Sequence, residues 1–87
     1  MYDYSGLPEG LQDGMKLYVE EGIGTGGFLT ACLENDLVGA VHRADDTNRP
    51  LIQNIVTWMY WELPIESWGT KEKVAKWRSE KVNERYT

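Results

Sequence analysis

The glycine-rich loop at residues 22–27, of sequence GIGTGG, is the first segment whose residue types and spacing could do chemistry. It matches the G-x-G-x-x-G pattern of dinucleotide-binding proteins, but that pattern requires a preceding strand within a βαβ unit. A helical pattern precedes this loop, so we exclude binding of the Rossmann type. A glycine loop that enters a helix can still bind an anion, because the first backbone N–H groups are free and the helix dipole is positive there. The residues that would bind the anion are Gly24, Thr25, Gly26 and Gly27; alternatively, the glycines supply the positive φ angles of a tight turn.

A second polar cluster follows at residues 43–49, where the sequence reads RADDTNR. Arginine presents a planar fork of N–H donors that suits phosphate or carboxylate groups. Arg43, Asn48 and Arg49 are therefore candidates for binding a phosphate-containing ligand. Alternatively, Arg43 and Asp45 brace the turn through capping and ion pairing.

The chain holds four tryptophans, more aromatic surface than one small helical core requires. Trp58 and Trp61 are the candidates for stacking on a planar ligand or for anchoring a protein interface. Alternatively, all four tryptophans fill the core: Trp58, Trp61, Trp68 and Trp77.

The sequence offers no recognisable catalytic or metal-binding constellation. His42 is the single histidine and Cys32 the single cysteine, and neither has a second ligand at the spacing of a zinc site. Ten residues along one helix separate the two by about 15 Å, so they cannot form a dyad within one subunit. No acid–base pair or activated nucleophile is evident. We therefore expect no metal, no cofactor and no enzymatic activity, with Cys32 as a core residue.

Length and charge narrow the possible classes of protein. The 87 residues make a single helical domain, residues 1–87, whose core is small, so we expect a homo-oligomer. The net charge of −5 argues against direct binding to nucleic acid. One cysteine fits a reducing compartment. With no signal peptide and no apolar run of about 20 residues, we expect a cytoplasmic protein without membrane contact.

Helical periodicity and punctuation predict an all-α fold, a small bundle of about four helices at residues 8–21, 28–44, 49–62 and 71–84. Pro8 fits a first turn, Pro64 ends a helix, and Thr70 is a suitable N-cap. The first three helices should form the core. The fourth should pack across them through Val74 and Trp77.

Charge is distributed unevenly along the chain. Residues 1–46 hold nine acids and two bases, whereas residues 70–87 hold six bases and three acids. A basic last helix on an acidic body could dock onto a neighbouring subunit or an acidic partner. The alternative is a charged helix face in contact with water.

Three segments resemble a family of short, acidic, helical accessory proteins encoded by bacteriophages and prophages. They are residues 18–22 running into 26–37 (YVEEG and GGFLTACLENDL), residues 43–48 (RADDTN) and residues 63–70 (LPIESWGT). The resemblance covers about residues 7–77, and its middle segment is the most specific. Gly24 stands where members of such a family would carry a proline, a departure that affects the stiffness of the loop. The resemblance implies a non-enzymatic accessory or counter-defence protein.

Three functions follow as hypotheses. The first is a sponge that binds and sequesters a nucleotide-derived, phosphate-containing immune signalling molecule of the bacterial host, and the glycine loop and arginines favour it. The second is an inhibitor that binds a host defence protein, with the acidic first half imitating nucleic acid. The third is a structural or regulatory phage protein that oligomerises. The host pathway rests on analogy with other phage proteins, not on particular residues.

Overall fold

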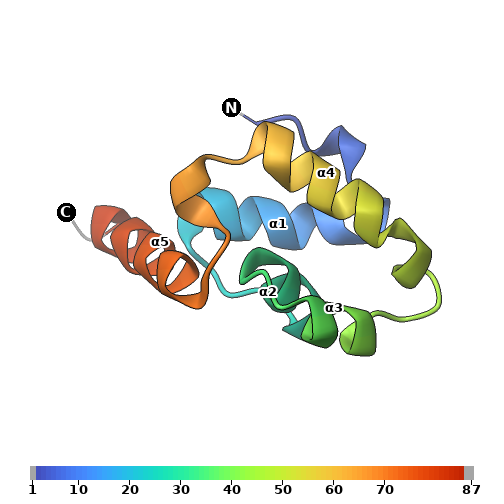
Figure 1. Ribbon diagram of the computed structural model, residues 1–87. Coiled ribbons are helices and arrows are strands. Elements are labelled where there is room, and N and C mark those ends of the chain that lie inside the picture. Colours follow the sequence, from blue (N-terminus) through green and yellow to red (C-terminus); the bar gives the residue numbers. More distant parts are fainter. Residues whose placement is uncertain (1, 86–87) are drawn as a thin grey trace.

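The computed structural model describes residues 2–85, and every regular element in that range is helical (Figure 1). This confirms the all-α prediction. None of these helices is long and apolar enough to span a lipid bilayer. The elements are η1 (Tyr4–Gly6), α1 (Glu9–Glu21), α2 (Gly27–Leu33), α3 (Leu37–Arg43), η2 (Arg49–Leu51), α4 (Ile52–Glu62), η3 (Ile65–Ser67) and α5 (Lys71–Arg85), where η marks a single 3-10 turn.

Helix α1 begins and ends close to the positions that its proline and glycine residues predict. Pro8 occupies the N-cap, and Gly22 closes the helix in the left-handed conformation with φ of 71°. The Gly22 N–H donates to the carbonyls of Leu17 and Tyr18. A side chain at Gly22 would be strained, because its Cβ would stand 2.7 Å from the Lys81 Cβ of α5.

The prediction of one helix over residues 28–44 is wrong, because the chain breaks it into α2 and α3. Asn35 takes a positive φ of 62°, which ends α2, and asparagine is among the few residues that adopt this conformation readily. Asp36 then caps α3, its side chain accepting a 2.9 Å hydrogen bond from the Gly39 N–H. Asn35 thus ends α2, and Asp36 starts α3.

The last two helices lie close to their predicted positions. Helix α4 starts at Ile52 rather than at residue 49, because residues 49–51 form the 3-10 turn η2, in which the Leu51 N–H donates to the Asn48 carbonyl at 2.9 Å. Leu63-Pro64 ends α4 as predicted. The Thr70 hydroxyl accepts a hydrogen bond from the Lys73 N–H at 3.1 Å and so confirms the N-cap of α5.

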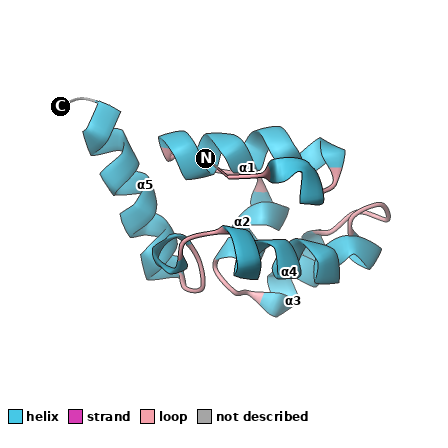
Figure 2. Ribbon diagram, turned by 90° about the horizontal axis from the view of Figure 1, so that it is seen from above, coloured by secondary structure: helices cyan, strands magenta, loops and turns pink. Residues whose placement is uncertain are grey.

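The core is formed mainly by buried side chains of α1, α2 and α4, three helices that Figures 1 and 2 show from two directions. Cys32 belongs to this core, as predicted, and burial raises the pKa of its thiol to about 11. The side chains with almost no exposed surface are Met15, Tyr18, Val19, Leu33, Ile55, Met59 and Ser67.

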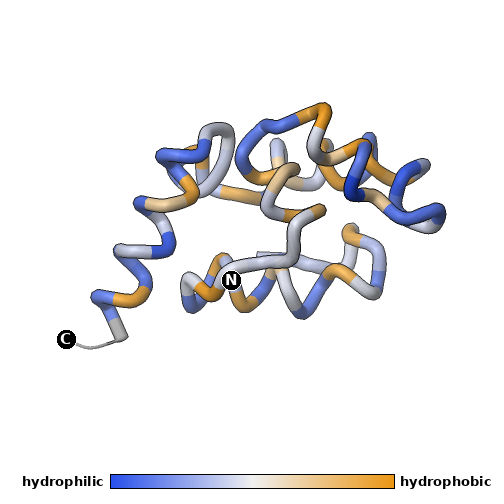
Figure 3. Tube along the Cα trace, turned by 90° about the horizontal axis from the view of Figure 1, so that it is seen from below, coloured by the Kyte–Doolittle hydropathy of each residue, from blue (hydrophilic) through white to orange (hydrophobic). Residues whose placement is uncertain are grey.

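Helix α5 lies at one end of the molecule, against the end of α1 and against η3 (Figure 2). It is mostly hydrophilic along its length (Figure 3). Val74 is buried and Trp77 half-buried, so the predicted inward pair is confirmed. The Trp77 indole donates to the Val19 carbonyl at 3.2 Å, and the Arg78 Nε donates to the Gly22 carbonyl at 3.3 Å.

Replacing Tyr18 with phenylalanine should lower the free energy of unfolding by about 1–3 kcal/mol, because the buried Ser67 carbonyl loses its donor.

Burial also raises the pKa of the Tyr18 phenol above its ordinary value of about 10. The native state then holds this proton more tightly than the unfolded state, so the stability that Tyr18 contributes is complete below pH 10 and is lost as the pH rises further. Urea titrations at pH 7 and pH 11 test both effects. Tyr60→Phe is the control, since Tyr60 is 66% exposed; an equal loss in that variant would contradict the assignment.

Candidate ligand-binding site

A hollow of about 340 Å³ opens between α1, the start of α2 and the turn that follows α3. It brings together the glycine loop and the 43–49 cluster, two segments that the sequence marks separately for anion binding. The sequence-predicted residues that line it are Gly26, Gly27, Arg43 and Asn48, and they are joined by Gly10, Gly14, Phe28 and Asp45.

The hollow exposes bare backbone that the chain's own packing does not require. Gly14 lies inside α1, where a glycine weakens a helix by about 1 kcal/mol relative to alanine, and Gly10 lies in the first turn of the same helix. A Cβ at Gly10 or Gly26 would meet no atom within 4 Å, and one at Gly14 would meet Leu29 at an ordinary 3.8 Å. Since no neighbour excludes a side chain at these positions, packing does not require glycine there, and all three glycines line the hollow.

Two further glycines leave room for the side chain of Arg43 at the side of the hollow. A Cβ at Gly39, one turn earlier in α3, would lie 2.6 Å from a terminal nitrogen of Arg43, and a Cβ at Gly27 would lie 3.1 Å from its Cδ. The side chain therefore runs over bare backbone at both positions. Its ion pair with Asp36 is long, 3.9 Å, and within residues 2–85 the guanidinium has no other polar partner. Most of its N–H donors are available to a ligand.

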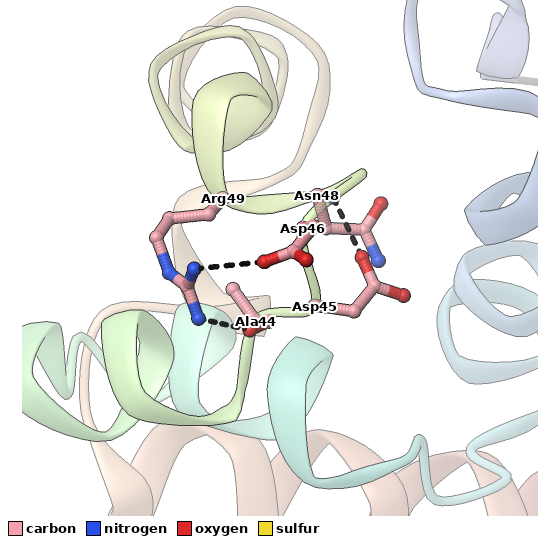
Figure 4. Close-up of polar contacts among 5 residues, drawn as sticks. All are labelled: Ala44, Asp45, Asp46, Asn48 and Arg49. Carbon is pink, nitrogen blue, oxygen red and sulfur yellow. Dashed lines mark hydrogen bonds and ion pairs between the residues drawn. The ribbon is translucent and has the colours of Figure 1, made fainter.

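The turn after α3 directs Arg49 to one side and Asp45 and Asn48 to the other (Figure 4). Arg49 donates to the Ala44 carbonyl at 2.8 Å and pairs with Asp46 at 3.2 Å, so it braces the turn and does not line the hollow. Asp45 and Asn48 extend to the other side, where the Asp45 carboxylate accepts from the Asn48 N–H at 2.7 Å. In the described chain the side-chain amide of Asn48 has no hydrogen-bond partner.

The first half of the glycine loop lies outside the hollow. Gly24 lies against the guanidinium of Arg78, whose Cζ would be 3.1 Å from a Cβ at that position. The Thr25 hydroxyl is hydrogen-bonded to the hydroxyl of Thr30 at 2.8 Å. The loop therefore divides between a contact with α5 and the wall of the hollow.

The two candidate tryptophans also lie away from the hollow. Trp58 is 6% exposed, and its indole N–H donates to the Asp3 carbonyl at 2.8 Å, so it is a core residue. Trp61 is 76% exposed on the outer side of α4, where its ring meets that of Tyr60 edge to face. The aromatic ring that does line the hollow, Phe28, was missed by the sequence analysis.

Two more of these residues, Gly10 and Gly14, carry a signal in the sequence of α1. Gly10 and Gly14 are four residues apart, which places them on one face of a helix. Neither glycine was predicted to be a site residue, and the structure places both in the hollow.

Residues able to bind a metal do not gather anywhere in the described range, since no group of three His, Cys, Asp or Glu side chains forms there. Cys32 is buried and His42 is exposed. The lack of enzymatic activity remains a prediction.

No protein-family model matches the chain, and searches of curated proteins and of solved structures likewise returned no match. Membership of the phage family remains a prediction. The case for a function therefore rests on the residues of this chain.

Replacing Gly10 with alanine should raise the free energy of unfolding by up to about 1 kcal/mol, because the methyl group adds helix propensity and meets no neighbour. Gly22→Ala is the matched control and should be destabilising, since Gly22 has positive φ and contacts α5. Urea denaturation measures both. A destabilised Gly10→Ala variant would show that the fold itself needs this glycine.

Proposed function

We propose that the protein is a non-catalytic binding protein that sequesters a phosphate-containing, nucleotide-derived molecule in the glycine-lined hollow. The observation that carries this proposal is the meeting of Gly26 and Gly27 with Arg43 and Asn48 around one open space. Bare backbone, a guanidinium with free donors and an unpaired amide together make a suitable surface for phosphate oxygens.

The remaining residues of the hollow favour a nucleotide over inorganic phosphate. Asp45 places a carboxylate among the donors, which would repel a simple anion. The same carboxylate can accept hydrogen bonds from sugar hydroxyls or from the amino group of a base. Phe28 adds an apolar surface at the helix entrance. A ligand with one anionic end, for Arg43 and Asn48, and one end rich in hydrogen-bond donors, for Asp45, pairs with all of these groups.

Binding and sequestering the ligand, without any catalysis, is the role we assign to this site. The protein has a net charge of −5, so it attracts an anion only through local donors and gains nothing from long-range steering. The resemblance to phage accessory proteins supports a counter-defence sponge in the host cytoplasm that lowers the free concentration of an immune signal.

Replacing Arg43 with glutamine should weaken ligand binding by about 10-fold or more, because a hydrogen bond to a charged group contributes roughly 1.5–3 kcal/mol. Calorimetric titration with AMP, ADP-ribose and a cyclic dinucleotide measures the change. Arg49→Gln is the matched control, since Arg49 braces the turn and should leave affinity nearly unchanged. Gly10→Ala should weaken binding while stabilising the fold.

Native mass spectrometry of protein purified from its host identifies the ligand independently of the calorimetric titrations. A bound phosphate compound released on denaturation would support the proposal. If no compound binds in either experiment, the hollow is not a nucleotide site. A salt-sensitive complex with a host protein would then favour the inhibitor function.

A further inference from the structure

The outer side of α4 carries no charge. No charged residue occurs between Leu51 and Trp61, although charged residues make up 26% of the chain. Six residues of this helix are exposed, and together they form what we call the neutral face: Gln53, Asn54, Val56, Thr57, Tyr60 and Trp61.

The core of the protein does not need the neutral face. Helix α4 already buries Ile55, Trp58 and Met59 on its inner side. Tyr60 and Trp61 remain 66% and 76% exposed, with ring centroids 5.3 Å apart. Exposed tyrosine and tryptophan are the residues that most often carry the binding energy of protein interfaces.

Apolar surface continues from the neutral face toward α3 across a shallow groove of about 50 Å³. Leu37 and Val56 line this groove and are 70% and 41% exposed, and Ala40 is among its other apolar residues. Charge begins at the edges, with Asp36 in the groove and Glu62 beside Trp61.

We propose that the neutral face binds a second copy of this chain around a twofold axis. In a twofold contact the residues near the axis meet their own copies, so a charge there would face the same charge. Two chains that each carry a net charge of −5 can associate most readily where neither presents charge. A different partner protein imposes no such restriction, because opposite charges across the interface can give specificity. The uncharged centre of α4 therefore favours self-association.

The size of the patch sets the strength of this contact. Aromatic side chains bury about 150–250 Å² each, so Tyr60, Trp61 and the adjacent aliphatic residues supply several hundred Å². A specific interface at the small end of the range buries roughly 600 Å² per partner. We expect a weak, concentration-dependent dimer. The neutral face shares no residue with the hollow, so this inference does not depend on the proposed ligand.

Sedimentation velocity from about 10 μM to about 1 mM tests the dimer directly. Thr57 lies near the centre of the neutral face, so Thr57→Glu and Thr57→Lys should each weaken association by about 10-fold or more. Mixing these two variants should restore association, because opposite charges then meet across the axis. Ser79→Glu, on the exposed side of α5, is the matched control and should associate as the unmodified protein does. Circular dichroism verifies that each variant is helical.

A protein that remains monomeric at about 1 mM would overturn the proposal and leave the neutral face to a different partner. A mixture that associates no better than its two components would also overturn the twofold arrangement. Trp61→Ser provides a second test, and unchanged association in that variant would contradict the role of the exposed aromatics.

Discussion

The arrangement of the chain depends on one buried hydrogen bond, from the Tyr18 phenol of α1 to the Ser67 carbonyl 49 residues later. The two oxygens are 2.6 Å apart, and neither residue has appreciable exposed surface. The Gly69 N–H donates in turn to the Leu33 carbonyl at the end of α2, at 2.7 Å. Because a buried polar group without a partner costs about 1–3 kcal/mol, these two bonds fix the path of the connector. That path determines where α5 starts and how it reaches Gly22.

The break between α2 and α3 is equally important for the hollow. If residues 28–44 formed one straight helix, Arg43 would lie about 24 Å along the axis from Gly27. The turn at Asn35 and Asp36 folds α3 back along α2, so that Arg43 runs over the start of α2. Gly39 makes room both for the capping carboxylate and for the guanidinium. Local backbone conformation thus brings Arg43 against Gly27, and the proposed ligand site depends on this contact.

Local signals made much of this structure predictable. Pro8, Pro64 and Thr70 located helix ends because each acts through its own backbone or the next turn. The positive φ of Asn35 could not be separated from an ordinary helical asparagine, because the hydrophobic pattern continues through it. Which residues from distant parts of the chain lie together was harder still to predict from the sequence. Sequence grouped Arg43 with Arg49, but only Arg43 lines the hollow, and only the folded chain brings Gly10 to the same space.

Two surfaces of this small domain hold residues that its own fold does not favour. A glycine inside a helix, such as Gly14 in α1, lowers helix stability by about 1 kcal/mol, a considerable fraction of the roughly 5–15 kcal/mol that stabilises a typical domain. The exposed Tyr60 and Trp61 leave apolar area in water without adding to the core. Features that weaken a fold without a packing reason are evidence for contacts outside the chain. Because the two surfaces share no residue, a dimer formed through α4 would use none of the residues that line either hollow. Each chain would then bind its own ligand, and the capacity to sequester would scale with the number of chains.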